Sequence, residues 1–87
     1  MAEKMKTAVF VSGGGTNLQA LIDSIQRGEI RSAEIACVIS NKENAYALER
    51  AKKAGIPCAA FTEDFEAQAL AYMEKHGVEL IVLAGFL

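Results

Sequence analysis

The sequence predicts an α/β protein in which four parallel strands alternate with three helices. Four short runs of almost entirely apolar residues recur along the chain, as expected of strands that are covered on both faces of a parallel sheet. Stretches with helical spacing of apolar residues separate these runs. Each of these stretches ends close to a glycine: Gly28, Gly55 or Gly77. Strands that alternate with helices in this way form parallel sheets through right-handed crossovers.

The first half of the chain contains the clearest strand and helix. The strand is expected at residues 7–11, which read Thr-Ala-Val-Phe-Val. The helix follows three consecutive glycines at 13–15 and ends at Arg27 and Gly28. One apolar stripe, with the spacing of a helix that is buried on one face, is formed by Leu18, Leu21, Ile22 and Ile25.

The remaining elements repeat this pattern. We expect strands at residues 34–39, 58–61 and 80–84, and a second helix at 44–54. The third helix has candidate caps at residues 62–64. Its apolar stripe is formed by Phe65, Ala69, Tyr72 and Met73.

The simplest strand order is 3-2-1-4, as in the first half of a Rossmann-like fold. The fourth strand would then be an apolar edge, and proteins normally protect such edges. We therefore interpret residues 1–87 as a single domain that is truncated after the fourth strand. An alternative hypothesis is a homodimer that forms through the exposed edge of this strand.

The composition is that of a soluble globular chain, with 52% hydrophobic and 23% charged residues. The net charge is −2 and no basic cluster exceeds Lys52-Lys53, so the sequence lacks the footprint of a nucleic-acid-binding protein. No apolar run approaches the roughly 20 residues of a membrane span, and residues 1–6 lack a signal segment. Cys37 and Cys58 lie in apolar stretches, which predicts buried, reduced thiols in a cytoplasmic protein.

The most informative stretch is the glycine-rich loop before the first helix. Thr16 and Gln19 fit the S/T-x-x-E/Q capping box, which predicts Thr16 as the N-cap. Such a loop leaves backbone N–H groups unpaired at the positive end of the helix dipole, where they can bind a phosphate or carboxylate. Asn17 would add a side-chain contact or bond to its own backbone. A tight turn that needs glycine for a positive φ is the simpler alternative.

The loop does not match the known nucleotide fingerprints. Gly13 and Gly15 supply the first two glycines of G-x-G-x-x-G, but Leu18 stands at the third position. The second strand ends in Ser40 and Asn41, so it provides no carboxylate for a ribose. A Walker loop is excluded because no Gly-Lys-Ser/Thr follows. A site for a phosphate monoester remains.

These residues resemble one known family. Residues 12–19, Ser-Gly-Gly-Gly-Thr-Asn-Leu-Gln, are similar to the S-G-x-G-[ST]-N-[LFM]-Q signature of the phosphoribosylglycinamide formyltransferases, which are folate-dependent enzymes of purine synthesis. The resemblance covers essentially all of the chain from Lys6 onward, with shorter matches at 38–41, 45–51, 54–57 and 83–86.

The resemblance implies that the enzyme transfers a formyl group from 10-formyltetrahydrofolate to the amine of 5-phosphoribosylglycinamide, without a metal. It implies that Gly15, Thr16 and Asn17 hold the phosphate of this substrate, and the neighbouring Gly14 joins them in the candidate site. Leu87 would begin the loop of the folate pocket. The alternative function is that of a non-catalytic phosphate- or nucleotide-binding module of flavodoxin-like form.

The chain also departs from the family pattern. The family's arginine before the third helix is absent, and the acidic segment 63–68 stands there. The family's catalytic Asn-x-His-Pro-Ser motif and a later aspartate are absent too. His76, the only histidine, is expected at a helix C-terminus, away from the carboxyl ends of the strands. We therefore expect no catalytic residue, and no transferase activity, in this chain alone.

Overall fold

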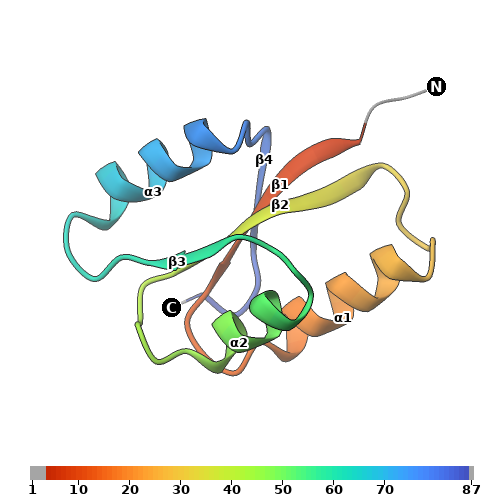
Figure 1. Ribbon diagram of the computed structural model, residues 1–87, viewed down its shortest axis with the longest axis horizontal. Helices are drawn as coiled ribbons and strands as arrows, with labels where there is room; N and C mark the ends of the chain where they lie inside the picture. Colours follow the sequence, from red (N-terminus) through yellow and green to blue (C-terminus); the bar gives the residue numbers. More distant parts are fainter. Residues whose placement is uncertain (1–3, 87) are drawn as a thin grey trace.

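The structure, a computed structural model, describes residues 4–86, in which strands and helices alternate as predicted (Figure 1). Every strand lies where an apolar run predicted it, and the second helix is shorter at both ends than the predicted 44–54. In chain order the elements are β1 (Met5–Val11), α1 (Thr16–Gln26), β2 (Ala33–Ser40), α2 (Tyr46–Lys53), β3 (Cys58–Ala60), α3 (Phe65–Lys75) and β4 (Leu80–Leu83).

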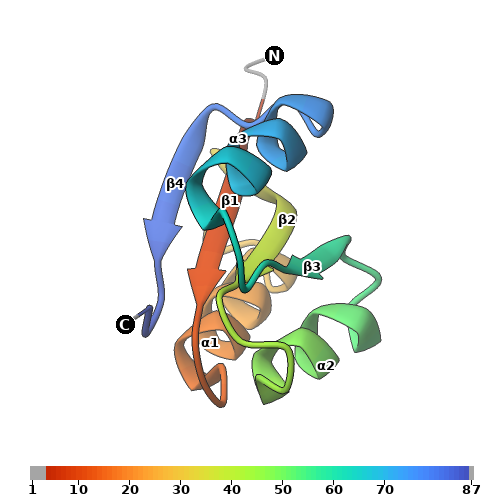
Figure 2. The same cartoon turned by 90° about the vertical axis from the view of Figure 1, so that its left-hand side faces the viewer.

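The strands form one parallel sheet in the order β3-β2-β1-β4, which confirms the predicted order. β1 pairs along its whole length with β2, with a register shift between Thr7 and Ala8. On its other side, residues 7–10 pair with β4. Figure 2 shows the arrowheads of β1 and β4 directed to the same end of the molecule. The loops that follow the parallel strands therefore meet where the carboxyl ends of the strands lie.

Helices cover both faces of this sheet. Successive side chains of a strand point to opposite faces, so Val9 and Val11 pack in the cluster with α1 and α2, whereas Ala8 and Phe10 pack in the cluster with α3. Figure 1 shows α1 and α2 together on one side of the sheet and α3 on the other. The sheet is the middle of three layers, which explains why residues 8–11 of β1 are all apolar.

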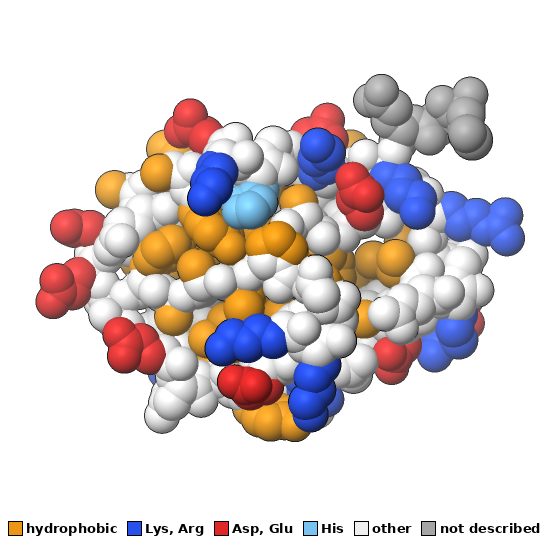
Figure 3. Space-filling model, in the orientation of Figure 1, with side chains coloured by type: hydrophobic (Ala, Val, Ile, Leu, Met, Phe, Trp, Pro, Cys, Tyr) orange, Lys and Arg blue, Asp and Glu red, His pale blue; other side chains and the backbone are white. Residues whose placement is uncertain are grey.

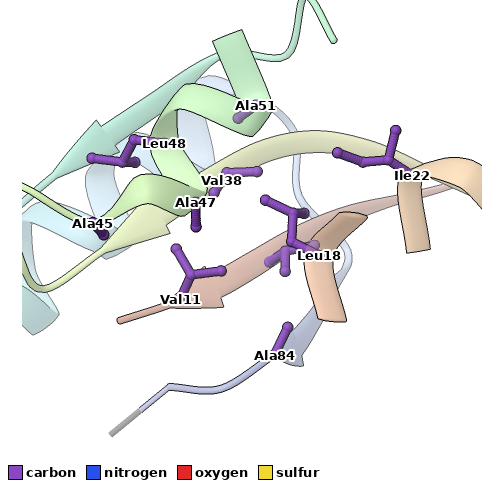
Figure 4. Close-up of a cluster of buried hydrophobic side chains, with 10 residues drawn as sticks. Val11, Leu18, Ile22, Val38, Ala45, Ala47, Leu48, Ala51 and Ala84 are labelled. Atoms are coloured by element: carbon purple, nitrogen blue, oxygen red, sulfur yellow. The ribbon is translucent and has the colours of Figure 1, made fainter. Parts of the chain in front are cut away.

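The larger core cluster lies between the sheet and the helices α1 and α2 (Figure 4). Leu18 and Ile22, from the predicted stripe of α1, are buried in it. α2 contributes Ala47 and Ala51, which are fully buried. Because alanine side chains are small, α2 approaches its neighbours closely on this face. On the other face of the sheet, Ala69 of α3 is buried as its stripe predicts.

The start of α1 differs from the prediction. The N-cap is Gly15, in the left-handed conformation with a φ of 81°, and no side chain caps the helix. Thr16 is the first helical residue, and the side-chain amide of Gln19 donates to Asp23 at 3.0 Å instead of reaching back. The predicted capping box is therefore wrong, because the chain enters the helix through a left-handed residue one position earlier. At α3 the predicted cap Asp64 is the N-cap, also without a side-chain hydrogen bond.

β4 is more exposed than its apolar sequence predicts. Leu80, Ile81 and Leu83 are 42%, 48% and 65% exposed. Within the described residues β4 pairs only with β1, so it forms one edge of the sheet. This agrees with the apolar edge expected from the strand order, and a homodimer through this edge stays a prediction.

The surface carries charges of both signs. Figure 3 shows Lys and Arg side chains interspersed with Asp and Glu around one face, with hydrophobic side chains between them. Among residues 4–86, no helix combines the length and the apolarity that a membrane crossing needs.

The two cysteines are free thiols, and the predicted burial is confirmed for Cys37 but wrong for Cys58. Cys37 in β2 is fully buried, and Cys58 at the start of β3 is half-buried. Burial raises the pKa of the Cys37 thiol to about 11. Since the thiolate is the reactive form of cysteine, Cys37 is a packing residue at neutral pH.

Candidate anion-binding site

The glycine-rich loop, residues 12–15, connects the carboxyl end of β1 to the first turn of α1. β1 is also where the strand order reverses, because β2 lies on one side of it and β4 on the other. Ligands of doubly wound sheets bind outside the strand carboxyl ends at such a reversal. The hydroxyl of Ser12 donates to Asn41 Oδ1 at 2.8 Å and so joins the loop to the segment that follows β2.

All three glycine carbonyls of this loop accept hydrogen bonds from the protein. The backbone N–H of Ala47 donates to Gly13 O at 3.0 Å. Nε of Arg50 donates to Gly14 O at 2.7 Å. The carbonyl of Gly15 accepts the first backbone hydrogen bond of α1, at 2.8 Å. Two of the three donors belong to α2, so α2 holds the loop in its conformation.

The orientation of these carbonyls determines where the following N–H groups point. In a trans peptide, the C=O of one residue and the N–H of the next lie in one plane and point in opposite directions. The N–H groups of Gly14, Gly15 and Thr16 are therefore directed away from the donors that hold the three carbonyls. None of these N–H groups donates a hydrogen bond to another described residue. They lie at the N-terminus of α1, the positive end of its dipole.

Gly15 is the loop position at which a side chain does not fit. Its φ of 81° is in the left-handed region that favours glycine. A Cβ at this position would lie 2.6 Å from the Cβ and 2.7 Å from the Cα of Ala47. Gly13 and Gly14 have no positive φ and face open space. A turn that needs glycine for its conformation thus accounts for Gly15, but it does not account for Gly13 and Gly14.

The structure places the predicted phosphate-binding residues together. Gly14, Thr16 and Asn17 are exposed, and Gly15 is half-buried beside them. All lie in the loop or the first turn of α1. A side-chain contact from Asn17 to the ligand stays a prediction. Leu87, the predicted start of the folate loop, lies outside the described residues.

Sequence reasoning missed the contribution of α2. Neither Ala47 nor Arg50 was assigned a role in the site. These residues are three positions apart, so they lie on the same side of a helix. This spacing is the one sequence signal that could have identified Arg50, and it is informative only once Ala47 is known to contact the loop.

The groups usually associated with catalysis lie elsewhere. His76 is the C-cap of α3, with its ring centroid 4.5 Å from that of Tyr72. This helix end leads into the start of β4. It therefore lies at the amino ends of the strands, whereas the loop lies at their carboxyl ends. Burial raises the pKa of the Tyr72 hydroxyl. No group of three or more His, Cys, Asp or Glu side chains is placed to hold a metal ion in residues 4–86. At the loop, the chemical groups available to an anion are backbone N–H donors.

Comparison with known proteins places the chain in a family. A family model described as formyl transferase matches residues 5–87. The chain belongs to the formyl transferase family. Among curated formyl transferases, the phosphoribosylglycinamide formyltransferase of Haemophilus influenzae is 48% identical over 89 residues, a match that covers 94% of this chain and 42% of that protein.

Solved structures of formyl transferases share the fold. Glycinamide ribonucleotide transformylase 1 from Symbiobacterium toebii superposes with a TM-score of 0.87 at 35% identity, over 97% of this chain and 42% of that one. The phosphoribosylglycinamide formyltransferase from Coxiella burnetii gives a TM-score of 0.86 at 41% identity, over 98% and 43% of the two chains. The predicted Rossmann-like fold is confirmed. The chain spans less than half the length of each of these relatives.

Proposed function

We propose that this chain is the substrate-binding part of a phosphoribosylglycinamide formyltransferase, and that residues 14–17 bind the phosphate of 5-phosphoribosylglycinamide. The observation that carries this proposal is the orientation of the loop peptides. Their carbonyls are held by the protein, so the N–H groups of Gly14, Gly15 and Thr16 face outward. Outward N–H groups at a helix N-terminus are well suited to the oxygens of a phosphate monoester.

Within the whole enzyme, this chain would position the substrate for the transfer of a formyl group from 10-formyltetrahydrofolate. The primary amine of the substrate attacks the formyl carbon, which requires a group that accepts the amine proton and donors that stabilise the tetrahedral oxyanion. A phosphate held at one fixed point restricts where the amine can lie, and such positioning lowers the barrier to reaction. We assign this binding and positioning role to the loop and α1.

The alternative, a non-catalytic phosphate- or nucleotide-binding module of flavodoxin-like form, has less support. The family match extends over nearly the whole chain, and the 48% identical relative is a phosphoribosylglycinamide formyltransferase. A dinucleotide is disfavoured further because Leu18, where the fingerprint requires glycine, is fully buried in the core.

An NMR titration of the nitrogen-15-labelled chain tests phosphate binding. We expect 5-phosphoribosylglycinamide to shift the amide signals of residues 13–17, and to shift them more than inorganic phosphate does. A phosphate monoester loses its second proton near about pH 6, so binding should be tighter above that pH than below it. NADH serves as the control ligand. Larger shifts with NADH, or no shifts at residues 13–17 with any ligand, would contradict the proposal.

The purified chain alone is expected to show no formyl transfer. In the described residues, N–H donors lie at the loop, at the carboxyl ends of the strands. The only histidine, His76, lies at the other end of the strands. The measurement is formation of formylated product from 5-phosphoribosylglycinamide and 10-formyltetrahydrofolate. The Haemophilus influenzae enzyme, assayed in parallel, shows that the assay works. Product above the buffer blank with this chain alone would contradict the expectation that it contains no catalytic residue.

A further inference from the structure

We propose that Arg50 of α2 is a positioning residue for the anion site. It holds the peptide between Gly14 and Gly15 in the orientation that turns the N–H of this peptide toward a bound phosphate. This inference rests on the proposed function and extends the site from the loop to a side chain of the neighbouring helix.

Arg50 is held by contacts with three segments of the chain. Its Nε donates to Gly14 O in the loop at 2.7 Å. Its Nη1 donates to Gln19 Oε1 of α1 at 3.4 Å. Within α2, the guanidinium lies over the ring of Tyr46, with 5.1 Å between Cζ and the ring centroid. A planar guanidinium combines donors in its plane with an aromatic contact on its face, so these contacts define one orientation of the side chain.

Among the three loop carbonyls, that of Gly14 is the one whose orientation depends on a side chain. The carbonyls of Gly13 and Gly15 accept backbone N–H groups, which are placed by the helices themselves. Gly14 O accepts Nε of Arg50 and has no other hydrogen bond within the described residues. Without this bond, the low steric barriers of glycine would let the peptide rotate. Its carbonyl oxygen would then face the site and repel an anion.

Arg50 also brings a positive charge to the loop, and this effect can be separated from positioning. Attraction by charge alone would be served equally well by lysine. Holding Gly14 O while contacting both Gln19 and Tyr46 requires several donors in one plane, which lysine does not have. The substitution Arg50→Lys therefore keeps the charge and removes the geometry.

The test compares ribose 5-phosphate binding to the unaltered chain and to three variants by NMR titration. Arg50→Lys should weaken binding about tenfold, as expected when the hydrogen bond from the N–H of Gly15 to the charged phosphate is lost. Arg50→Gln, which also lacks the charge, should weaken it at least as much. Lys52→Gln is the matched control, because it removes a charge from the same helix and Lys52 pairs only with the exposed Glu49, at 3.6 Å, within the described residues. Its affinity should change by less than about twofold.

A second readout in the ligand-free chain distinguishes positioning from a general structural role. In Arg50→Lys the carbonyl carbon-13 signal of Gly14 and the amide signal of Gly15 should shift, while the signals of the core residues Val9 and Val38 stay in place. Circular dichroism verifies that each variant is folded. Arg50→Gln provides the same comparison with a shorter, neutral side chain.

The outcomes separate this inference from the proposed function. Normal binding by the unaltered chain together with unchanged binding by Arg50→Lys would contradict the positioning role and leave the proposed function standing. Equal losses in Arg50→Gln and Lys52→Gln, with normal binding by Arg50→Lys, would show that charge alone matters, which also contradicts positioning. If the unaltered chain binds no ribose 5-phosphate, both the proposed function and the role of Arg50 are wrong.

Discussion

Replacing Gly15 with alanine is expected to lower the free energy of unfolding by about 2–5 kcal/mol. One part of this loss arises because a side chain at a φ of 81° is strained. The other arises because the new Cβ would lie 2.6 Å from the Cβ and 2.7 Å from the Cα of Ala47. The second contact involves backbone, so the loop or α2 must move. Urea unfolding followed by circular dichroism measures the effect.

Gly14→Ala is the matched control for this prediction. Gly14 lies next to Gly15 in the same loop, but it has no positive φ and a Cβ there meets nothing within 4 Å. Its stability should stay within about 1 kcal/mol of the unaltered chain, since alanine also restricts the unfolded state. Equal losses in the two variants would mean that neither the left-handed conformation nor the contact with Ala47 determines the stability of the loop.

Replacing Leu18 with alanine is the second substitution with a large expected effect. Leu18 is fully buried between α1 and the sheet, as Figure 4 shows. Removing a buried leucine side chain costs about 2–5 kcal/mol, through lost burial and the cavity that remains. Domains of this size are stable by only roughly 0.05–0.15 kcal/mol per residue, so a large fraction of the total stability is lost. Thermal unfolding should show a midpoint lowered by about 8 °C or more.

Leu70→Ala is the matched control, because it makes the same leucine-to-alanine change at an exposed position. Leu70 lies on α3 and is 56% exposed, so its truncation should change the free energy of unfolding by no more than about 0.5 kcal/mol. A loss in Leu70→Ala comparable with that in Leu18→Ala would show that burial in this cluster does not dominate the stability of the chain.

The strands and the position of the loop could be predicted because both depend on local patterns, whereas the strand order was predicted from the Rossmann-like alternation of strands and helices. Residues 8–11 of β1 are all apolar since helices cover both faces of the strand, and the glycines follow after Ser12. The predicted cap at Thr16 was wrong because the capping pattern cannot report the left-handed conformation of Gly15. That conformation is tied to the close approach of Ala47, which is distant in sequence.

The contribution of Arg50 could not be predicted for a similar reason. The hydrogen bond to Gly14 O joins residues 36 positions apart. This hydrogen bond forms only because β2 pairs with β1, so that α2, which follows β2, lies next to the loop. The exposure of β4 could be predicted from the strand order, which places this strand at the edge of the sheet, but not from its own apolar sequence.

If the loop binds a ligand as proposed, the attachment of the loop carbonyls to α2 links that binding thermodynamically to the helix. Local opening of α2 would break the hydrogen bonds to the carbonyls of Gly13 and Gly14 together, and the loop would lose the conformation of the site. By linkage, a ligand that binds only the intact loop raises the free energy of that opening. The proposed binding of a phosphate should therefore slow hydrogen exchange in α2, whose N-terminus already donates to the loop. The affinity for that phosphate would include the cost of keeping α2 closed, so a substitution far from the loop would weaken binding if it loosened α2.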